Sequence, residues 1–379
     1  MGVRRRPAVL AVDAGNSKTD VALIDADGTV LATGRSGGFQ PQRAGVAAAV
    51  DVLARAVAEA VEAAGLARLG ARAEAGSGVG SGPDGRDGGR AGGGAGACSG
   101  GRAGDGAGAG AGERAPLAPY ADQVSACLAG ADLPVEERQL AQALAARGWG
   151  ARTDVRNDTF AILRAGLPHG AAPLGVAVVC GAGINCVGML PDGRTARFPA
   201  LGRLSGDWGG GGALAQEALW WAARAADGRG RPTELAAALP GHFGLASVPE
   251  LVEALHLGVI TQARTHELVP VLFAVAAAGD EVARSLVERQ ADEVVAMAVV
   301  ALTRLDLLAR EAPVLLGGGV LAARHPLLDD RIAAGLAERA PHARVSVVTA
   351  PPVLGAGLLG LDAVGAPAAA FGKLRAHFG

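Results

Sequence analysis

Two short polar loops in this sequence carry the residue types that hold phosphate groups. The first loop comes directly after Asp13 and reads Ala14-Gly15-Asn16-Ser17-Lys18-Thr19. A glycine lets the backbone approach a ligand closely, hydroxyl groups donate hydrogen bonds, and successive amides with a lysine attract an anion. Asp13 is well placed to hold a hydrated magnesium ion. An ordinary hairpin with a polar turn explains the stretch equally well, so this loop alone does not decide between the two interpretations.

The second loop repeats the design of the first. Residues 174–195 read LGVAVVCGAGINCVGMLPDGRT, and residues 8–29 read AVLAVDAGNSKTDVALIDADGT. Each segment runs from an apolar strand through a glycine loop to a second strand and an Asp-Gly turn. Two such units predict two related half-domains, whose facing loops would grip a polyphosphate from both sides. The repeat is typical of a sugar-kinase-like ATPase.

Further polar residues could complete a site beside these loops. Asp158 follows a short predicted strand, and a carboxylate near a sugar hydroxyl can take its proton as the bond to phosphorus forms. Either Asn157 or Asp158 could instead cap the helix predicted over 159–165. Asp207 is the only carboxylate of a glycine-dense loop over 202–212, whose backbone freedom predicts a loop shaped around a ligand. The glycines at 317–319 could admit adenosine or form a tight strand-to-helix turn.

Taken in order, these motifs resemble those of the N-acetylglucosamine kinase and BadF-type ATPase group, within the actin-like sugar-kinase superfamily. Residues 13–20 are similar to its first phosphate motif, and residues 181–186 resemble the second. Asn157-Asp158 looks like the N-D motif, whose aspartate is the family's catalytic base. Residues 206–209 look like G-D-E-G, whose aspartate contacts the amino sugar, and 317–319 match the adenosine motif.

The resemblance implies a fold, a set of ligands and a role for each matching residue. It implies two actin-like (ribonuclease-H-like) α/β domains around a central cleft that holds ATP and Mg²⁺, and commonly a homodimer. Asp158 would be the catalytic base, and Asp13 would hold Mg²⁺ through water. The sugar would contact Asn157, Asp158, Asn185 and Asp207, with Gln40 as a further candidate. The implied ATP and phosphate contacts are Asp13, Gly15, Asn16, Ser17, Lys18, Thr19, Gly181, Ala182, Gly183, Gly317, Gly318 and Gly319.

The sequence departs from the family pattern mainly on the sugar side. Ala182 and Ile184 stand where the second phosphate motif has threonine and serine, and Trp208 replaces the glutamate of G-D-E-G. The family's sugar-binding asparagine after the first hairpin is missing, and Phe39-Gln40-Pro41-Gln42 stands there. The phosphate machinery is therefore better supported than the sugar pocket.

Three functions fit these observations. The leading hypothesis is an ATP-dependent kinase that phosphorylates a primary hydroxyl of an amino sugar of the N-acetylglucosamine or glucosamine type. The alternatives are a BadF-type ATPase that activates a partner enzyme through an iron–sulfur cluster, and a nucleotide or sugar sensor that lost turnover. The scattered cysteines argue against the cluster-bridged ATPase.

Composition narrows the compartment and the class of partner. The net charge of −2 gives no bulk attraction to nucleic acid or to an anionic membrane. The first apolar run is too short for a secretory signal, and the uncharged run over 294–303 is too short to cross a bilayer. The four cysteines contain no C-x-x-C pair, so a reduced, cytoplasmic protein with a small-molecule substrate is expected.

The elements that must position these residues follow from periodicity and turn signals. The predicted domains cover 1–158 and 159–363, with a C-terminal helix over 364–379 that could pack back on the first domain. A glycine-rich stretch over 76–114 is predicted to be a disordered insertion. Strands are expected at 8–12, 20–24, 30–33, 124–128, 153–155, 314–316 and 345–349, with three more over 174–198. Helices are expected at 46–65, 134–147 and 159–165. A further helix should follow the glycine-dense loop and run through 220–221, and more helices are expected in pieces over 231–310.

One motif points elsewhere and is set aside. Residues 355–360 read G-A-G-L-L-G and match the dinucleotide fingerprint. Only 19 residues follow, too few for the rest of a βαβ unit and its ribose-binding acid. We expect these glycines to begin the last long helix and to let it pack closely on a neighbouring domain.

Overall fold

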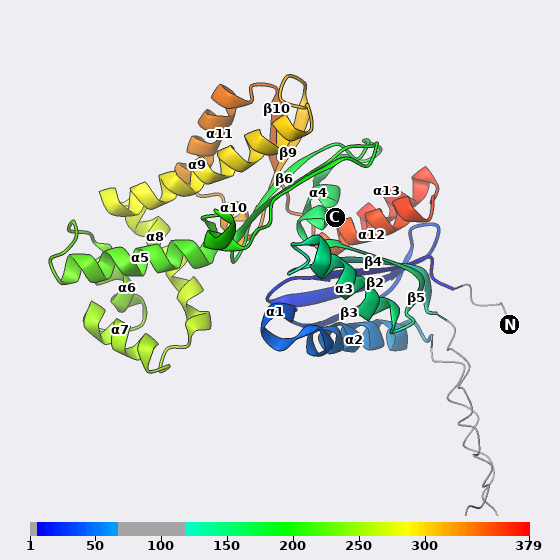
Figure 1. Ribbon diagram of the computed structural model, residues 1–379, viewed down its shortest axis with the longest axis horizontal. Helices are drawn as coiled ribbons and strands as arrows, with labels where there is room; N and C mark the ends of the chain where they lie inside the picture. The colour runs from blue at the N-terminus through cyan, green and yellow to red at the C-terminus, as the bar shows by residue number, and fades with distance from the viewer. Residues whose placement is uncertain (1–5, 67–118) are drawn as a thin grey trace, which may run out of the picture. The chain divides into compact units, whose positions relative to one another are not determined.

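The computed structural model describes residues 6–66 and 119–379 (Figure 1). The stretch over 76–114, predicted to be an insertion, lies outside the described residues. In the described part of the chain, none of the helices combines the length and the apolar character that crossing a membrane requires.

The first sheet has five strands in the order β3-β2-β1-β4-β5. β1, β2 and β3 form an antiparallel meander, and β4 and β5 add to β1 in parallel. β3 and β5 are longer than predicted, because pairing with a neighbouring strand orders polar residues that propensity alone leaves as loop. The strands are β1 (Val9–Ala14), β2 (Lys18–Ile24), β3 (Val30–Gly37), β4 (Ala121–Leu128) and β5 (Gly150–Asn157).

The second sheet repeats this topology. Its order is β10-β9-β6-β7-β8, with β6, β7 and β8 as the antiparallel meander and β9 and β10 added in parallel. The repeat predicted from the two glycine loops is therefore confirmed. The strands are β6 (Gly175–Cys180), β7 (Ile184–Met189), β8 (Thr195–Arg197), β9 (Ala312–Gly317) and β10 (Ala343–Val347).

Both faces of the first sheet are covered, which explains the continuous apolar run of β1. Leu10 and Val12 belong to a core with α2 (Val46–Ala63) and α3 (Pro134–Ala145). Val9 and Ala11 point the other way, because side chains alternate along a strand. They pack against α12 (Pro352–Ala363), which lies on the opposite side of the sheet from α2 (Figure 1).

Two helices lie between the sheets. α4 (Thr159–Gly166) and α12 share one hydrophobic core with residues of both sheets. The glycine motif makes this packing possible: a Cβ on Gly355 would lie 1.8 Å from the carbonyl oxygen of Ala161 in α4. The close-packing interpretation is confirmed. The predicted start of the last helix is wrong, because Pro352 opens α12 three residues earlier and a separate helix, α13 (Ala368–Phe378), follows.

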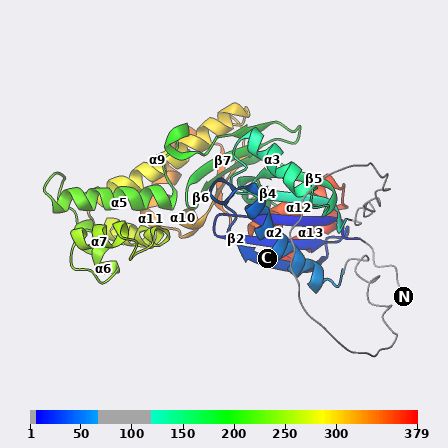
Figure 2. The ribbon, with the colours of Figure 1, turned by 60° about the horizontal axis from the view of Figure 1, so that its bottom comes forward.

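The remaining helices belong to the second half of the chain. α9 packs on β6 and β7, α11 packs on α9, and α5 and α9 run side by side in both views (Figures 1 and 2). The helices expected in pieces over 231–310 include α7 and α8, in whose first turns Pro249 and Pro270 lie. The helices are α5 (Gly210–Ala226), α6 (Leu235–His242), α7 (Val248–His256), α8 (Leu268–Ala277), α9 (Glu281–Arg304) and α11 (Pro326–Arg339).

Short helical turns complete the described chain. α1 (Pro41–Ala44) follows the first meander, and α10 (Gly319–Ala322) follows β9. Two 3₁₀ turns, Gly202–Ser205 and Gln262–Glu267, precede α5 and α8.

Candidate active site

A cavity of about 290 Å³ brings the two predicted phosphate loops together. We call it the phosphate cavity. Its walls come from the first hairpin, the start of α4, the second hairpin, the end of β9 and the start of α12. The residues that line it are Asp13, Gly15, Asn16, Ser17, Lys18, Asp158, Thr159, Ile162, Val179, Gly181, Ala182, Gly318 and Pro352.

The glycines of this cavity serve two different purposes. A Cβ on Gly181 would meet nothing within 4 Å, and one on Gly15 would meet only the Lys18 carbonyl oxygen at 3.8 Å. The fold does not need glycine at these two positions, so the space before them is open to a ligand. Gly318 is different, because its φ is +84° and a Cβ would lie 2.3 Å from the Cys180 carbonyl oxygen. Gly318 is required by the strand-to-helix turn itself.

Asp13 fits a cation at the mouth of the first loop. The residue is 6% exposed. Burial, with the nearby charges of Asp158 and Asp20, raises the pKa of Asp13 to about 8, while Lys18 opposes the shift. A divalent cation beside this carboxylate would stabilise its ionised form. Within residues 6–66 and 119–379 no three His, Cys, Asp or Glu side chains gather into a metal cluster. Asp13 is the residue that would hold Mg²⁺, with water and phosphate oxygens as its other ligands.

The first loop divides its side chains between the cavity and the fold. Ser17 and Lys18 line the phosphate cavity, and the Lys18 ammonium also lies 2.7 Å from a carboxylate oxygen of Asp20. Thr19 is fully buried, and its hydroxyl donates to the Gly37 carbonyl at 2.9 Å. The structure does not bring the Thr19 side chain into the cavity, because strand pairing between β2 and β3 takes its hydroxyl.

Asn157 and Asp158 have different tasks at the start of α4. The backbone N–H of Thr159 donates to Asn157 Oδ1 at 2.9 Å, whereas Asp158 makes no capping bond although it holds the N-cap position. The sequence left open which of the two caps the helix, and the structure assigns this to Asn157. Burial raises the pKa of Asp158 to about 6, against the N–H and hydroxyl of Thr159, which lower it. Asp158 lines the phosphate cavity together with Thr159.

Asp132 is a candidate that sequence reasoning missed. It accepts a hydrogen bond from Asn157 Nδ2 at 2.8 Å. Burial, together with the charges of Asp158 and Glu136, raises the pKa of Asp132 to about 7. A signal was present, because Asp132 comes just after the end of β4, and polar groups that follow parallel strands gather at one edge of the sheet.

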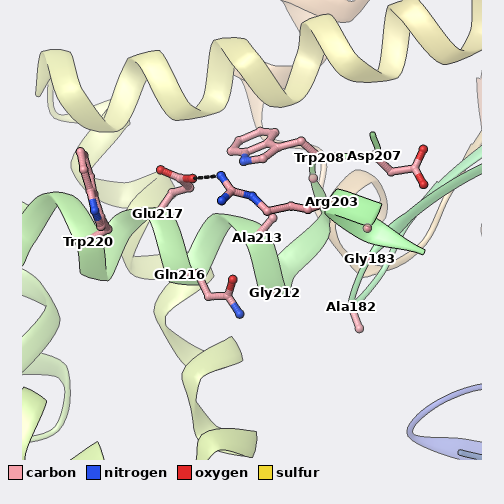
Figure 3. A pocket seen from close by; sticks show the side chains of 12 residues that line it. Ala182, Gly183, Arg203, Asp207, Trp208, Gly212, Ala213, Gln216, Glu217 and Trp220 are labelled. Atoms are coloured by element: carbon pink, nitrogen blue, oxygen red, sulfur yellow. Dashed lines mark ion pairs between the residues drawn. The ribbon is translucent and has the colours of Figure 1, made fainter. Parts of the chain in front are cut away.

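A larger cavity of about 730 Å³ lies beside α5, and we call it the α5 cavity (Figure 3). Ala182 lines both cavities, so they meet at the second hairpin. In Figure 3, Glu217 and Trp220 point to the same side of α5 and Gln216 points to the other. The residues that line it are Ala182, Gly183, Gly202, Arg203, Asp207, Trp208, Gly209, Gly212, Ala213, Gln216, Glu217 and Trp220.

Charge and aromatic surface characterise the α5 cavity. Arg203 and Glu217 form an ion pair at 3.6 Å. Trp208 is 6% exposed, and the guanidinium of Arg289 lies 4.0 Å from the centre of its ring. Asp207 lines this cavity and not the phosphate cavity. The predicted sugar-side aspartate is thus separated from Asp13 by the second hairpin.

The glycine-dense loop is explained by contact with the second hairpin. The N–H groups of Gly211 and Gly212 donate to the carbonyls of Gly181 and Ala182, both at 2.8 Å. A Cβ on Gly210 would lie 2.3 Å from the Gly183 backbone. The first turn of α5 therefore fixes the shape of the second loop, a role that the sequence interpretation had given to a ligand.

The remaining residues predicted for the site line neither of the two cavities. Gln40 donates to the Asn16 carbonyl at 2.9 Å and lines neither cavity. Gly317 belongs to β9, where a Cβ would press on Ile162, and Gly319 begins α10. Asn185 donates to Asn157 Oδ1 at 3.1 Å.

Solved structures share this fold. A proposed N-acetylglucosamine kinase from Chromobacterium violaceum superposes with a TM-score of 0.62 and 23% identity, over 94% of this chain and 99% of that one. A ROK family glucokinase from Streptomyces griseus, solved with glucose and AMPPNP, gives a TM-score of 0.50 and 17% identity over 93% and 97%. The predicted class, an α/β protein of two actin-like domains, is confirmed.

The chain belongs to the BadF/BadG/BcrA/BcrD ATPase family, whose sequence profile matches residues 10–360. Two curated proteins are similar to parts of the chain. An N-acetyl-D-glucosamine kinase of Dictyostelium discoideum is 26% identical over 210 residues, which is 55% of this chain. An N-acetylmuramic acid/N-acetylglucosamine kinase of Clostridium acetobutylicum is 24% identical over 202 residues, or 53%. The matches span 65% of the length of each relative.

Proposed function

We propose that this protein is an ATP-dependent kinase that phosphorylates a primary hydroxyl of an amino sugar of the N-acetylglucosamine or glucosamine type. One observation carries the proposal. Asp158 stands at the N-terminal end of α4 without a capping hydrogen bond, and it lines the cavity that both glycine hairpins share. The names of the two curated relatives support the choice of substrate class.

In this proposal Asp158 is the general base. A pKa of about 6 keeps its carboxylate mostly ionised at neutral pH while leaving it basic enough to accept a hydroxyl proton. Lys18, the Ser17 hydroxyl and the backbone at Gly15 and Gly181 would bind the phosphates. Mg²⁺ at Asp13 would neutralise charge on the phosphate oxygens.

The acceptor would lie between Asp158 and the α5 cavity. Asp207 is the proposed hydrogen-bond acceptor for its hydroxyl or amide groups, and Trp208 offers an aromatic surface. Asn157 and Asn185 each keep one amide N–H beyond the hydrogen bonds that they make, so both could also donate to a sugar oxygen. Gln40 would act by holding the Asn16 carbonyl.

An ADP-release assay tests the proposal. The purified protein is given MgATP with glucosamine, N-acetylglucosamine, N-acetylmuramate, glucose or no sugar. We expect turnover only with an amino sugar, and phosphate on its primary hydroxyl by NMR. Equal turnover in all five samples would overturn the kinase proposal.

That outcome would favour a second candidate, an ATPase that activates a partner enzyme, for which the family match is the supporting observation. An activator of the kind that the sequence leaves open would need cysteines that can bridge an iron–sulfur cluster. Cys127, Cys180 and Cys186 are free and buried, so none presents a thiol for such a bridge, and Cys98 lies outside the described residues. An anaerobic iron assay separates the two candidates. Nucleotide binding without any turnover would indicate a sensor.

We further propose domain boundaries at 158 and 363, a cytoplasmic location and a homodimer. A homodimer is what the family resemblance implies, and Leu204, Leu257 and Val259, which are 86%, 65% and 77% exposed, are apolar side chains that an interface would cover. Sedimentation of the purified protein tests the oligomeric state.

A further inference from the structure

A chain of three polar side chains connects the two halves of the molecule beside the proposed base. Asn157 Nδ2 donates to Asp132 Oδ1 at 2.8 Å, and Asn185 Nδ2 donates to Asn157 Oδ1 at 3.1 Å. Asp132 lies after β4, and Asn157 is the last residue of β5, so both belong to the first sheet's side. Asn185 belongs to β7 of the second sheet. Asn157 is 2% exposed. A buried amide of this kind is stable only when its polar atoms are paired.

Backbone groups fix the direction of every amide in this chain. The Thr159 N–H donates to Asn157 Oδ1 at 2.9 Å, so the nitrogen of that amide must face Asp132. The Cys186 N–H donates to Asn185 Oδ1 at 2.7 Å, so the nitrogen of Asn185 must face Asn157. The arrangement has one consistent orientation, and Asp132 is the acceptor at its end.

Asp132 itself has little other support. Its backbone N–H donates to Glu136, and Arg197 reaches its carbonyl oxygen at 3.3 Å. The Arg197 guanidinium forms its ion pair with Glu137 instead, at 2.8 Å. No described cation lies within ion-pair distance of the Asp132 carboxylate. The carboxylate lies in a partly buried neighbourhood, where the charges of Asp158 and Glu136 raise its pKa and the charge of Arg197 lowers it. The Asn157 amide is the side chain that donates a hydrogen bond to it.

The chain ends at two parts of the proposed catalytic machinery. Asn157 accepts from the first N–H of α4, one residue beyond Asp158, and Asn185 is the second residue of β7, just after the loop of the second hairpin. A shift of either end would change the distance between Asp158 and the phosphate cavity. Displacements of about 1 Å can reduce a rate by roughly 100-fold when they misplace reacting groups.

We infer that Asp132 is a positioning residue: by holding the Asn157 amide it keeps Asp158 and the second hairpin at one spacing. This inference rests on the proposed kinase function for its kinetic consequence. Its structural consequence, an ordered first turn of α4, does not depend on turnover.

The test compares Asp132→Ala with Asp132→Asn, whose amide oxygen can still accept from Asn157. Asp154→Asn is the matched control, because Asp154 is an exposed aspartate of the same region, on β5. We expect Asp132→Ala to lower kcat about tenfold or more, with the KM for ATP changed less than about threefold. Asp132→Asn should recover most of kcat, and Asp154→Asn should behave as the parent protein.

Hydrogen exchange gives the second readout. Amides at 159–162 should exchange at least about tenfold faster in Asp132→Ala than in the parent, and near the parent rate in Asp132→Asn. Asn185→Ala breaks the chain from the other half and serves if Asp132→Ala does not fold. Because Asn185 is also a proposed sugar contact, only its exchange readout is compared, and amides at 159–162 should exchange faster in it than in the parent. An unchanged kcat together with unchanged exchange in Asp132→Ala overturns the inference. If the parent protein proves inactive with every sugar, the proposed function fails, and the exchange result alone decides the inference.

Discussion

Arg375 Nη2 donates a 2.7 Å hydrogen bond to the carbonyl of Leu167, just beyond the C-terminal end of α4. The same guanidinium reaches the carbonyls of Ala165 at 2.9 Å and Arg164 at 3.3 Å. Helix ends leave carbonyls unpaired and carry partial negative charge, so a cation there stabilises the helix. α4 is thus held at its N-terminal end by Asn157 and at its C-terminal end by α13.

Replacing Arg375 with alanine should destabilise the protein by about 2–3 kcal/mol, because three half-buried carbonyls lose their donor. Urea unfolding measures the effect. Lys373→Ala is the control, since Lys373 makes a solvent-exposed ion pair with Asp27, and its removal should change stability far less than the removal of Arg375. Equal losses in the two variants would contradict the capping role of Arg375.

Valine at Gly15 or Gly181 should leave folding intact and abolish stabilisation by MgATP. Both positions have open space for a side chain in the free protein, and the side chain would fill the place of the phosphates. Thermal melting with and without MgATP checks this. Gly241→Val, at an exposed site in α6 with nothing within 4 Å of an added Cβ, should respond to MgATP normally. A normal response in Gly181→Val would show that the second hairpin does not contact phosphate.

Asp158→Asn should keep near-native melting, because Asp158 does not cap α4, while sugar phosphorylation falls at least ~100-fold. Asn157→Ala should lose about 1 kcal/mol or more of stability from the missing cap, and its turnover should fall as well, because the Asn157 amide belongs to the chain that positions Asp158. Measuring turnover and urea unfolding on both variants separates catalysis from stability. Full turnover in Asp158→Asn would direct the search for the base to Asp207 and Asp132.

The free protein should lose stability as the pH rises from about 5 to 8. Asp13, Asp132 and Asp158 have pKa values raised to about 8, 7 and 6 in the folded state, so the folded chain binds more protons than the unfolded chain in this range. Stability then falls with rising pH. Mg²⁺ should reduce this loss by stabilising ionised Asp13, and Asp13→Asn should flatten the profile. A melting temperature independent of pH would contradict this.

Activity should depend on pH in the opposite sense. Asp158 must be ionised to accept a proton, so kcat/KM should rise with pH through about 6. The neighbouring carboxylates titrate together with it, so the midpoint describes the group of three. A pH–rate profile between pH 5 and 8 measures the midpoint, and a flat profile would exclude a titrating base.

Local patterns in the sequence predicted what depends on local structure. The two hairpins with their apolar runs gave the repeated meander, and the phosphate loops met in one cavity as expected from that repeat. Thr19 was misplaced because a hydroxyl in a loop looks free until the pairing of β2 with β3 is known. Asp132 was missed because its partner, Asn157, lies 25 residues away. The choice between Asn157 and Asp158 as cap needed the backbone path at the start of α4.

The position of α12 has a consequence for how the chain is made. Val9 and Ala11 in the first strand are covered by a helix that begins at Pro352, so one face of the first sheet has no cover while the ribosome is still building the middle of the chain. The first half therefore cannot finish folding as it emerges. A nascent chain halted before Pro352 should present an apolar sheet face to chaperones, and synthesis of residues 352–363 should release it.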